Sequence, residues 1–264
     1  EQLHRSPRAI AADMMARYEP DLSALAQMRE DAEQQESLQA ITEVFAEACH
    51  RGATARTMTW LDRLNDAGAL TAAQRDQLAA EDGAANLTRI LRSAEIAGHD
   101  PYEVLAEAVG SHSLAGARNL SNVVYSRMRD RHEFTPPADA RWVDRVPALD
   151  NPGLQHFTWT LAEAADARED ALGAQAAADP PHWATELLGP VPDAESDPTA
   201  RAAWERKAGL VAGVRESARG TDDPAGDRGP SGRPVEAAEL LGPAPKAGRP
   251  EVHAAYRAAW DALG

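Results

Sequence analysis

Apolar side chains recur every three or four residues along the first two thirds of this chain, and each run ends near a glycine or a proline. One such run consists of Leu87, Ile90, Leu91 and Ala94. This spacing is typical of an amphipathic α-helix with one buried face, and Gly98 stands where a helix commonly ends in the left-handed conformation. The repeated pattern therefore predicts an all-α protein built from consecutive helices.

The composition favours closely packed helices over a sheet. Alanine is abundant, whereas aromatic residues make up only 5% of the 264 residues. A β-sandwich or barrel would need runs of β-branched and aromatic residues, and these are missing. We therefore predict an Ala-rich multi-helix bundle whose interior is built from small side chains.

Glycine and threonine residues mark the expected boundaries of the first helices. The helix that carries Phe45 is predicted to stop at Gly52, because glycine is unfavourable inside a helix. Thr54 can cap a second helix, which we expect to end near Gly68, and Thr71 can open a third.

Prolines mark the later boundaries. Asp100 and Pro101 follow Gly98 as an expected cap and first-turn proline. Ser113 is predicted to begin a longer helix that ends before the Pro136-Pro137 pair, since proline cannot continue a helix. A further long helix is expected over residues 154–178. We predict one domain over residues 1–135, a helical bundle, and another over residues 136–264.

The second predicted domain ends in an extended Pro/Gly-rich tail with an internal repeat. The sequence ELLGPVP at residues 186–192 recurs as ELLGPAP at residues 239–245. In each copy a short helix should stop at Gly-Pro and turn into an amphipathic helix. The two helical repeat units, residues 183–219 and 236–263, are expected to pack on each other or on a common neighbour. Residues 220–234 between them read as a mobile loop.

The net charge of −15 is evenly spread along the chain. Duplex DNA binding draws most of its affinity from phosphate neutralisation, so tight binding of nucleic acid by this chain alone is not expected. An acidic surface instead favours basic protein partners.

One cysteine, Cys49, excludes a disulfide within the chain and favours a reducing compartment, so we expect a cytoplasmic protein. The sequence has no run of 18 apolar residues that would span a membrane. The chain begins at Glu1 without a signal pattern, and we interpret it as a fragment of a longer protein.

The sequence predicts no catalytic residue, no cofactor and no metal site. The eight histidines are scattered, and the adjacent Cys49 and His50 would point to different faces of a helix. Neither a phosphate-binding glycine loop nor a nucleophile motif is present.

One segment, residues 118–145, is mildly basic and is the candidate nucleic-acid patch. Tyr125 and Trp142 could stack on bases there. Acidic residues interleave with the arginines, so a salt-bridged helix surface is the favoured alternative. The candidate contacts are Arg118, Arg127, Arg129, Arg131 and Arg141.

Four aromatic side chains in the tail are the candidate partner-binding residues: Trp183, Trp204, Tyr256 and Trp260. Because aromatics are scarce in this chain, these four hold much of the hydrophobic anchoring that an interface would need. Packing of the two repeat units on each other is the favoured alternative.

Several blocks also resemble a known family. The sequences AEIAGHDP at residues 94–101 and ARNLSNVVYSRM at residues 117–128 resemble the region beyond the helicase domain of actinobacterial MobF-class conjugative relaxases. The tail segments PHW, LGPVP, AWERKAG and LGPAP are similar to the terminal segment of that family. The resemblance covers roughly residues 85–264.

The resemblance implies a non-catalytic C-terminal interaction module that acts in plasmid transfer. The tyrosine-dependent nicking domain and the ATP-dependent helicase of such relaxases would lie outside this chain. The implied partner is the coupling protein of a type IV secretion channel or another relaxase copy. Two alternatives remain: an auxiliary DNA-binding domain that uses residues 118–145, and an unrelated helical adaptor.

Overall fold

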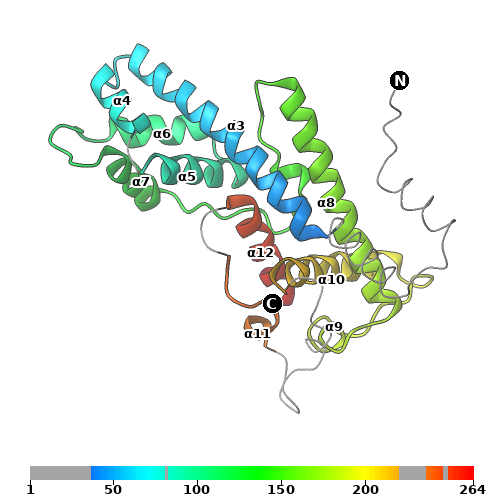
Figure 1. Ribbon diagram of the computed structural model, residues 1–264. Helices are drawn as coiled ribbons and strands as arrows, with labels where there is room; N and C mark the ends of the chain where they lie inside the picture. The colour runs from blue at the N-terminus through cyan, green and yellow to red at the C-terminus, as the bar shows by residue number, and fades with distance from the viewer. Residues whose placement is uncertain (1–36, 81–82, 220–235, 246–248) are drawn as a thin grey trace, which may run out of the picture.

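The protein folds into helices without β-strands in the part of the chain that the computed structural model describes, residues 37–80, 83–219, 236–245 and 249–264. This confirms the predicted all-α class (Figure 1). The first helices are α3 (Leu38–Asp66), α4 (Ala72–Ala80), α5 (Ala84–Ile96), α6 (Pro101–Gly110) and α7 (Leu120–Arg131). The later helices are the short 3-10 helix η1 (Val143–Arg145), α8 (Pro152–Ala178), α9 (His182–Leu187), α10 (Pro198–Arg219), α11 (Ala237–Leu241) and α12 (Pro250–Leu263).

The C-terminal half of α3 packs with α4 to α7 around large aliphatic side chains. Leu61, Leu87, Leu105 and Met128 are among the fully buried members of this core. We call this region, residues 57–134, the leucine lobe. The stripe that the sequence predicted on α5 lies in this core together with Val104, Leu105 and Ala108 of α6, and burial of these side chains stabilises the lobe.

Several predicted boundaries in the leucine lobe are confirmed. Thr71 accepts a hydrogen bond from the Gln74 N–H at 3.2 Å and donates its own N–H to the Gln74 side chain at 3.0 Å, which is a capping box at the start of α4. Gly98 has φ of 84° after α5. Asp100 accepts hydrogen bonds from the N–H groups of the first turn of α6.

Three predicted boundaries are wrong. Helix α3 is 29 residues long and does not end at Gly52. The Thr54 hydroxyl donates a hydrogen bond to the His50 carbonyl within this helix and does not cap a second helix. A Cβ on Gly52 would collide with the side chain of Leu149, so this glycine makes room for the segment before α8. The last helix of the lobe begins at Leu120, capped by Asn119, and not at Ser113.

Helices α8 and α10 cross with their backbones in close contact. A Cβ on Gly173 would collide with the Glu205 carbonyl oxygen of α10, and a Cβ on Gly209 would collide with the Glu169 carbonyl oxygen of α8. Each helix thus carries a glycine four residues after the carbonyl that the other helix approaches. This reciprocal arrangement, which we call the glycine crossing, requires the absence of side chains at both positions.

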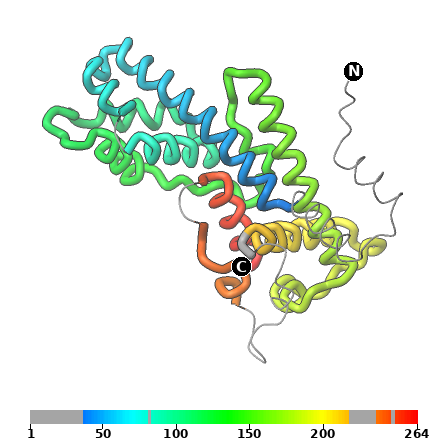
Figure 2. Tube along the Cα trace, viewed as in Figure 1, coloured from blue at the N-terminus to red at the C-terminus, as the bar shows by residue number. Residues whose placement is uncertain are grey.

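The two repeat units pack on each other (Figure 2). Residues of α9 and α10 share one hydrophobic core with residues of α11 and α12, including Trp183, Trp204, Leu241 and Ala259. Gly189 and Gly242 have positive φ values of 82° and 69° at equivalent positions of the repeat. The expected loop at residues 220–234 lies outside the described residues.

A third core joins the two predicted domains. Leu38 and Phe45 of α3 pack with Trp142, with Ala165 of α8 and with Ala255 of α12. Helix α12 also packs against α5. Segments from both sides of residue 135 therefore contribute to the same interior.

Candidate functional site

The tail aromatics occupy different environments from those expected of partner-binding residues. Trp183 and Trp204 are only 2% and 5% exposed, so they cannot anchor a partner, and the alternative, packing of the two repeat units on each other, holds for both. The α9–α12 core takes up both rings, because the two repeat units bury their apolar faces against each other. Trp260 is 39% exposed and stacks on the half-buried Tyr256, with ring centroids 6.4 Å apart.

Trp204 and Tyr256 play the same structural part in the two repeat copies. The Trp204 indole Nε1 donates a hydrogen bond to the Gly189 carbonyl at 3.1 Å. The Tyr256 hydroxyl donates to the Gly242 carbonyl at 2.8 Å. In each copy, an aromatic side chain of the second helix therefore holds the carbonyl of the glycine that ends the first helix.

The candidate nucleic-acid patch is divided between structural and solvent-exposed arginines. Arg127 donates to the carbonyl oxygens of Ala108, His112 and Ser113 at 3.0, 3.0 and 3.3 Å, and so fixes the connection between α6 and α7. Its guanidinium group is thus committed to the fold.

Arg131 and Arg141 are paired with acids. Arg131 lies 2.9 Å from Glu107, and Arg141 lies 2.6 Å from Asp170. Arg118 and Arg129 are exposed. Trp142, expected to be available for stacking on bases, is 1% exposed and cannot serve in that way.

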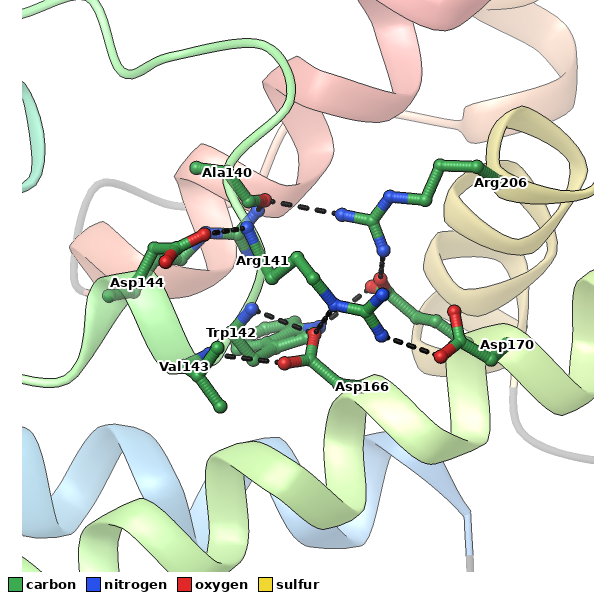
Figure 3. A network of polar contacts seen from close by, with 10 residues as sticks. Ala140, Arg141, Trp142, Val143, Asp144, Asp166, Asp170 and Arg206 are labelled. Atoms are coloured by element: carbon green, nitrogen blue, oxygen red, sulfur yellow. Dashed lines mark hydrogen bonds and ion pairs between the residues drawn. The ribbon is translucent and has the colours of Figure 1, made fainter. Parts of the chain in front are cut away.

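Trp142 belongs to a network that attaches residues 140–146 to α8 (Figure 3). Its backbone N–H donates to Asp166 at 2.9 Å, and its indole Nε1 donates to Glu169 at 2.7 Å. Arg206 of α10 lies 3.4 Å from the Glu169 carboxylate and donates to the Ala140 carbonyl. The network therefore joins α8, α10 and the segment that precedes η1.

The same network extends to α5 and α12 through two buried arginines. Arg92 pairs with Glu251 at 2.7 Å, with both side chains almost fully buried, and with Glu95 at 2.9 Å. Arg92 also donates to the Arg145 carbonyl. The Arg145 guanidinium lies 4.7 Å from the centroid of the Trp142 ring. We call this set the charged junction; its buried charged members are Arg92, Arg145, Asp166, Glu169 and Glu251.

Burial dominates the electrostatics of the charged junction. Burial raises the pKa of Glu169, although Arg145, Trp142 and Arg206 act in the opposite direction. Burial also lowers the pKa of Arg145. For Arg92, burial lowers the pKa, but the charges of Glu251 and Glu95 outweigh it and raise the pKa overall.

The charged junction positions helices, since most of its groups contact one another or the backbone, although Nε and Nη1 of Arg145 are buried without a hydrogen-bond partner among the described residues. Sequence reasoning did not find it, because Arg92 and Glu251 are 159 positions apart and Asp166 and Glu169 read as surface acids of a helix. The only local signal in the sequence is helical spacing: Asp166 and Glu169 fall on the same face of α8 as the small residues Ala162, Ala165 and Gly173.

No group of three or more histidine, cysteine, aspartate or glutamate side chains suited to a metal ion occurs among the residues that the structure describes. Cys49 is buried, and burial raises the pKa of its thiol. Of the described helices, none has both the length and the apolar character to cross a membrane.

Besides Trp260, two further aromatic side chains are exposed, in a helix where the sequence predicted no partner-binding residue. Phe157 and Trp159, in the N-terminal half of α8, are 47% and 44% exposed. Figure 1 shows this end of α8 projecting beside α3. Both residues lie in the long helix that the sequence predicts over residues 154–178. The spacing of these two aromatics indicates that they cannot share one buried stripe, because residues two apart on a helix point to different faces.

Comparison of the chain with protein-family models, with curated proteins and with solved structures found no match.

Proposed function

We propose that this chain is a non-catalytic protein-interaction module of a conjugative relaxase, acting in plasmid DNA transfer from the cytoplasm. The observation that carries the interaction role is the exposure of Phe157 and Trp159 at the projecting end of α8. A chain with so few aromatics leaves two of them in solvent within one helical turn. Exposed aromatic side chains are typical anchors of protein interfaces.

The electrostatics favour a basic partner surface. The chain carries a net charge of −15, and the exposed residues Asp150 and Glu163 flank the two aromatics along the sequence. Because the two aromatic side chains point to different faces of α8, a partner would contact the end of this helix from both sides, with apolar sites surrounded by lysine or arginine. On the resemblance to MobF-class relaxases, the partner is the coupling protein of a type IV secretion channel or a second relaxase copy.

The charged junction supports a structural role for the ionisable groups that are buried. Catalytic acids and bases must reach a substrate, whereas Asp166 and Glu169 are buried and hold the N–H groups of Trp142 and Val143. The carboxylates of Asp166 and Glu169 thereby hold the segment around Trp142 against α8.

Binding of the purified chain to a purified coupling protein from a type IV secretion system tests the proposal. The variant Phe157→Ser/Trp159→Ser should bind at least about thirtyfold more weakly, because two interface anchors that contribute more than about 1 kcal/mol each together contribute more than about 2 kcal/mol. Trp260→Ser, an exposed aromatic on α12, is the matched control and should bind as the unchanged chain does. Self-association of the same variants, measured by sedimentation, distinguishes a second copy from a coupling protein.

Two results would contradict this proposal. One is the absence of binding both to the coupling protein and to a second copy of the chain. The other is undiminished binding by the Phe157→Ser/Trp159→Ser variant with loss in Trp260→Ser, which would move the interface to the tail.

An auxiliary DNA-binding domain is the second candidate. Arg118 and Arg129 are the exposed arginines of the patch that favour it, whereas the pairing of Arg131 and Arg141 with acids opposes it. Salt-dependent binding of single-stranded DNA that is lost in Arg118→Gln would favour this function over the first.

A further inference from the structure

A cavity of about 440 Å³ lies over one face of α5, between α7 and the start of α12. Its floor is a helical stripe that includes Arg89, Ile90 and Ser93. Tyr125 and Arg129 of α7 line one side, and Pro250 and His253 of α12 line the other. Both α7 and α12 pack on α5, so the walls are held by the fold. We call this cavity the α5 groove.

The α5 groove is positively charged within an acidic chain. Arg89 and Arg129 both line it, and among the described residues neither has a carboxylate within ion-pair distance. Glu133 is the one carboxylate in the lining, which also holds two histidines: His253, and His132, which lies 3.2 Å from Glu107. Unneutralised guanidinium groups facing one cavity favour an anion.

Arg89 is placed to use this capacity. Its Nη1 donates to the Asn86 side chain at 2.9 Å, but its Nε is buried and has no hydrogen-bond partner in the described part of the chain. A buried donor without a partner costs stability, and a shift of the Arg89 side chain toward a bound anion would let this atom form a hydrogen bond.

The remaining walls of the α5 groove suit a planar ring. Ile90, Tyr125, Phe134 and Pro250 supply apolar and aromatic surface. Arg129 lies 6.0 Å from the centroid of the Tyr125 ring, so a guanidinium group and an aromatic face stand next to each other. This combination of cations and aromatic faces is the one that recognises a phosphate and a base together.

A second hollow of about 290 Å³ adjoins the α5 groove and shares Arg89 and Pro250 with it. Arg249 and His50 also line this hollow, with Glu47 and Glu251 as its acids. Arg249 is half exposed and lies 3.8 Å from Glu43, the longest ion pair of the described residues. Arg89 thus stands between two hollows, where a phosphate could be reached from either side.

From these observations we propose that the α5 groove binds a nucleoside monophosphate unit, either as a free nucleotide or as one unit of a single strand. The phosphate contacts Arg89 and Arg129, and the base lies against Tyr125. This role goes beyond the proposed protein-interaction function and uses a different surface from Phe157 and Trp159.

Calorimetric titration of the whole chain with AMP, adenosine and inorganic phosphate separates the two contributions. AMP should bind at least tenfold more tightly than adenosine or phosphate alone, since only AMP uses both the cations and the aromatic wall. Arg89→Gln and Arg129→Gln should each weaken AMP binding about tenfold. Arg257→Gln, an exposed arginine of α12 outside the groove, is the matched control and should leave AMP affinity unchanged.

A twelve-residue oligodeoxyadenylate distinguishes the two sources of nucleotide. Tighter binding of the strand than of AMP, weakened by Arg129→Gln, assigns the α5 groove to single-stranded DNA; exclusion of the strand with retained AMP binding assigns it to free nucleotides. The proposal is overturned if AMP fails to bind at millimolar concentration, binds no better than phosphate, or is unaffected by both groove variants. These assays need no protein partner, so their failure leaves the interaction function untouched.

Discussion

In the leucine lobe, helices meet through Leu, Ile, Val and Met side chains, whereas at the glycine crossing and the charged junction they meet through backbone contact and paired charges. The first arrangement gains stability from apolar area removed from water and tolerates small shifts of one helix against another. The second depends on exact partners, because a buried charge without its partner is costly. Two regions of one chain thus differ in what a single substitution can damage.

The largest effect is expected where a buried charge loses its partner. Glu251→Ala leaves Arg92 buried beside Glu95 alone and should lower the free energy of unfolding by about 3 kcal/mol or more. The double variant Arg92→Met/Glu251→Leu should recover most of this loss, because apolar side chains of similar volume often replace a buried ion pair at little cost. Urea unfolding measures both.

Leu105→Ala in the leucine lobe is the comparison for that pair. It should cost about 2–5 kcal/mol through lost burial and a residual cavity. Equal stabilities of the double variant and of Glu251→Ala would show that the junction depends on packing, as the lobe does, and would remove the distinction between the two regions.

A smaller effect is expected at the glycine crossing. Gly209→Ala places a methyl group against the Glu169 carbonyl oxygen and should cost about 2 kcal/mol, despite the gain in helix propensity. Gly110→Ala at the end of α6 meets no atom within 4 Å and should be neutral or stabilising by up to about 1 kcal/mol. Thermal unfolding of the two variants compares them, and similar shifts would contradict the close backbone contact.

The pH dependence of stability distinguishes the regions further. Because burial raises the pKa of Glu169 above its usual 4.5, the protonated side chain is favoured in the folded protein. Its contribution is complete below pH 4.5 and is lost as the pH rises through the raised pKa. Three neighbouring charges act on the same carboxyl group: Arg145 and Arg206 lower its pKa, and Asp166 raises it.

Glu169→Gln should therefore gain stability relative to the unchanged chain between pH 5 and pH 8, by up to about 1.4 kcal/mol for each pH unit by which the pKa is raised. Denaturant unfolding at the two pH values measures this difference. A difference between the two proteins that does not change with pH would mean that Glu169 is ionised in the folded state.

The smallest effect concerns the repeat. Tyr256→Phe removes the hydrogen bond to the Gly242 carbonyl and should cost about 1 kcal/mol. Tyr102→Phe is the control in the leucine lobe, where the Arg63 guanidinium lies 3.8 Å from the Tyr102 ring centroid and the ring is retained, so its cost should stay within about 0.5 kcal/mol. Equal costs for the two variants would indicate that the carbonyl contact in the repeat contributes little.

The same contrast explains what could be predicted from the sequence. The leucine lobe follows from local patterns, because the stripe of Leu87, Ile90 and Leu91 and the caps at Gly98 and Asp100 need no knowledge of distant residues. Gly52 carries the same local signal as Gly98, yet the helix continues through it, since the reason for that glycine is Leu149, almost a hundred residues later. Tertiary packing decides such positions.

The candidate site was less accessible to sequence reasoning. The repeat was visible in the sequence, but the burial of Trp183 and Trp204 follows from docking of one copy on the other. Trp142 lies between arginines and reads as a surface residue, and only its contacts with Asp166 and Glu169 bury it. The α5 groove brings α5, α7 and α12 together, which no single stretch of sequence contains.

Helix α3 has a consequence for how the molecule melts. Its first turns, with Leu38 and Phe45, belong to the core around Trp142, and its last turns, with Leu61 and Leu64, belong to the leucine lobe. Unfolding of either core would leave half of α3 without packing partners, and a helix without tertiary packing is only marginally stable in water. Heating should therefore produce one calorimetric peak for both regions, and a chain cut after residue 135 should not yield two independently folding halves.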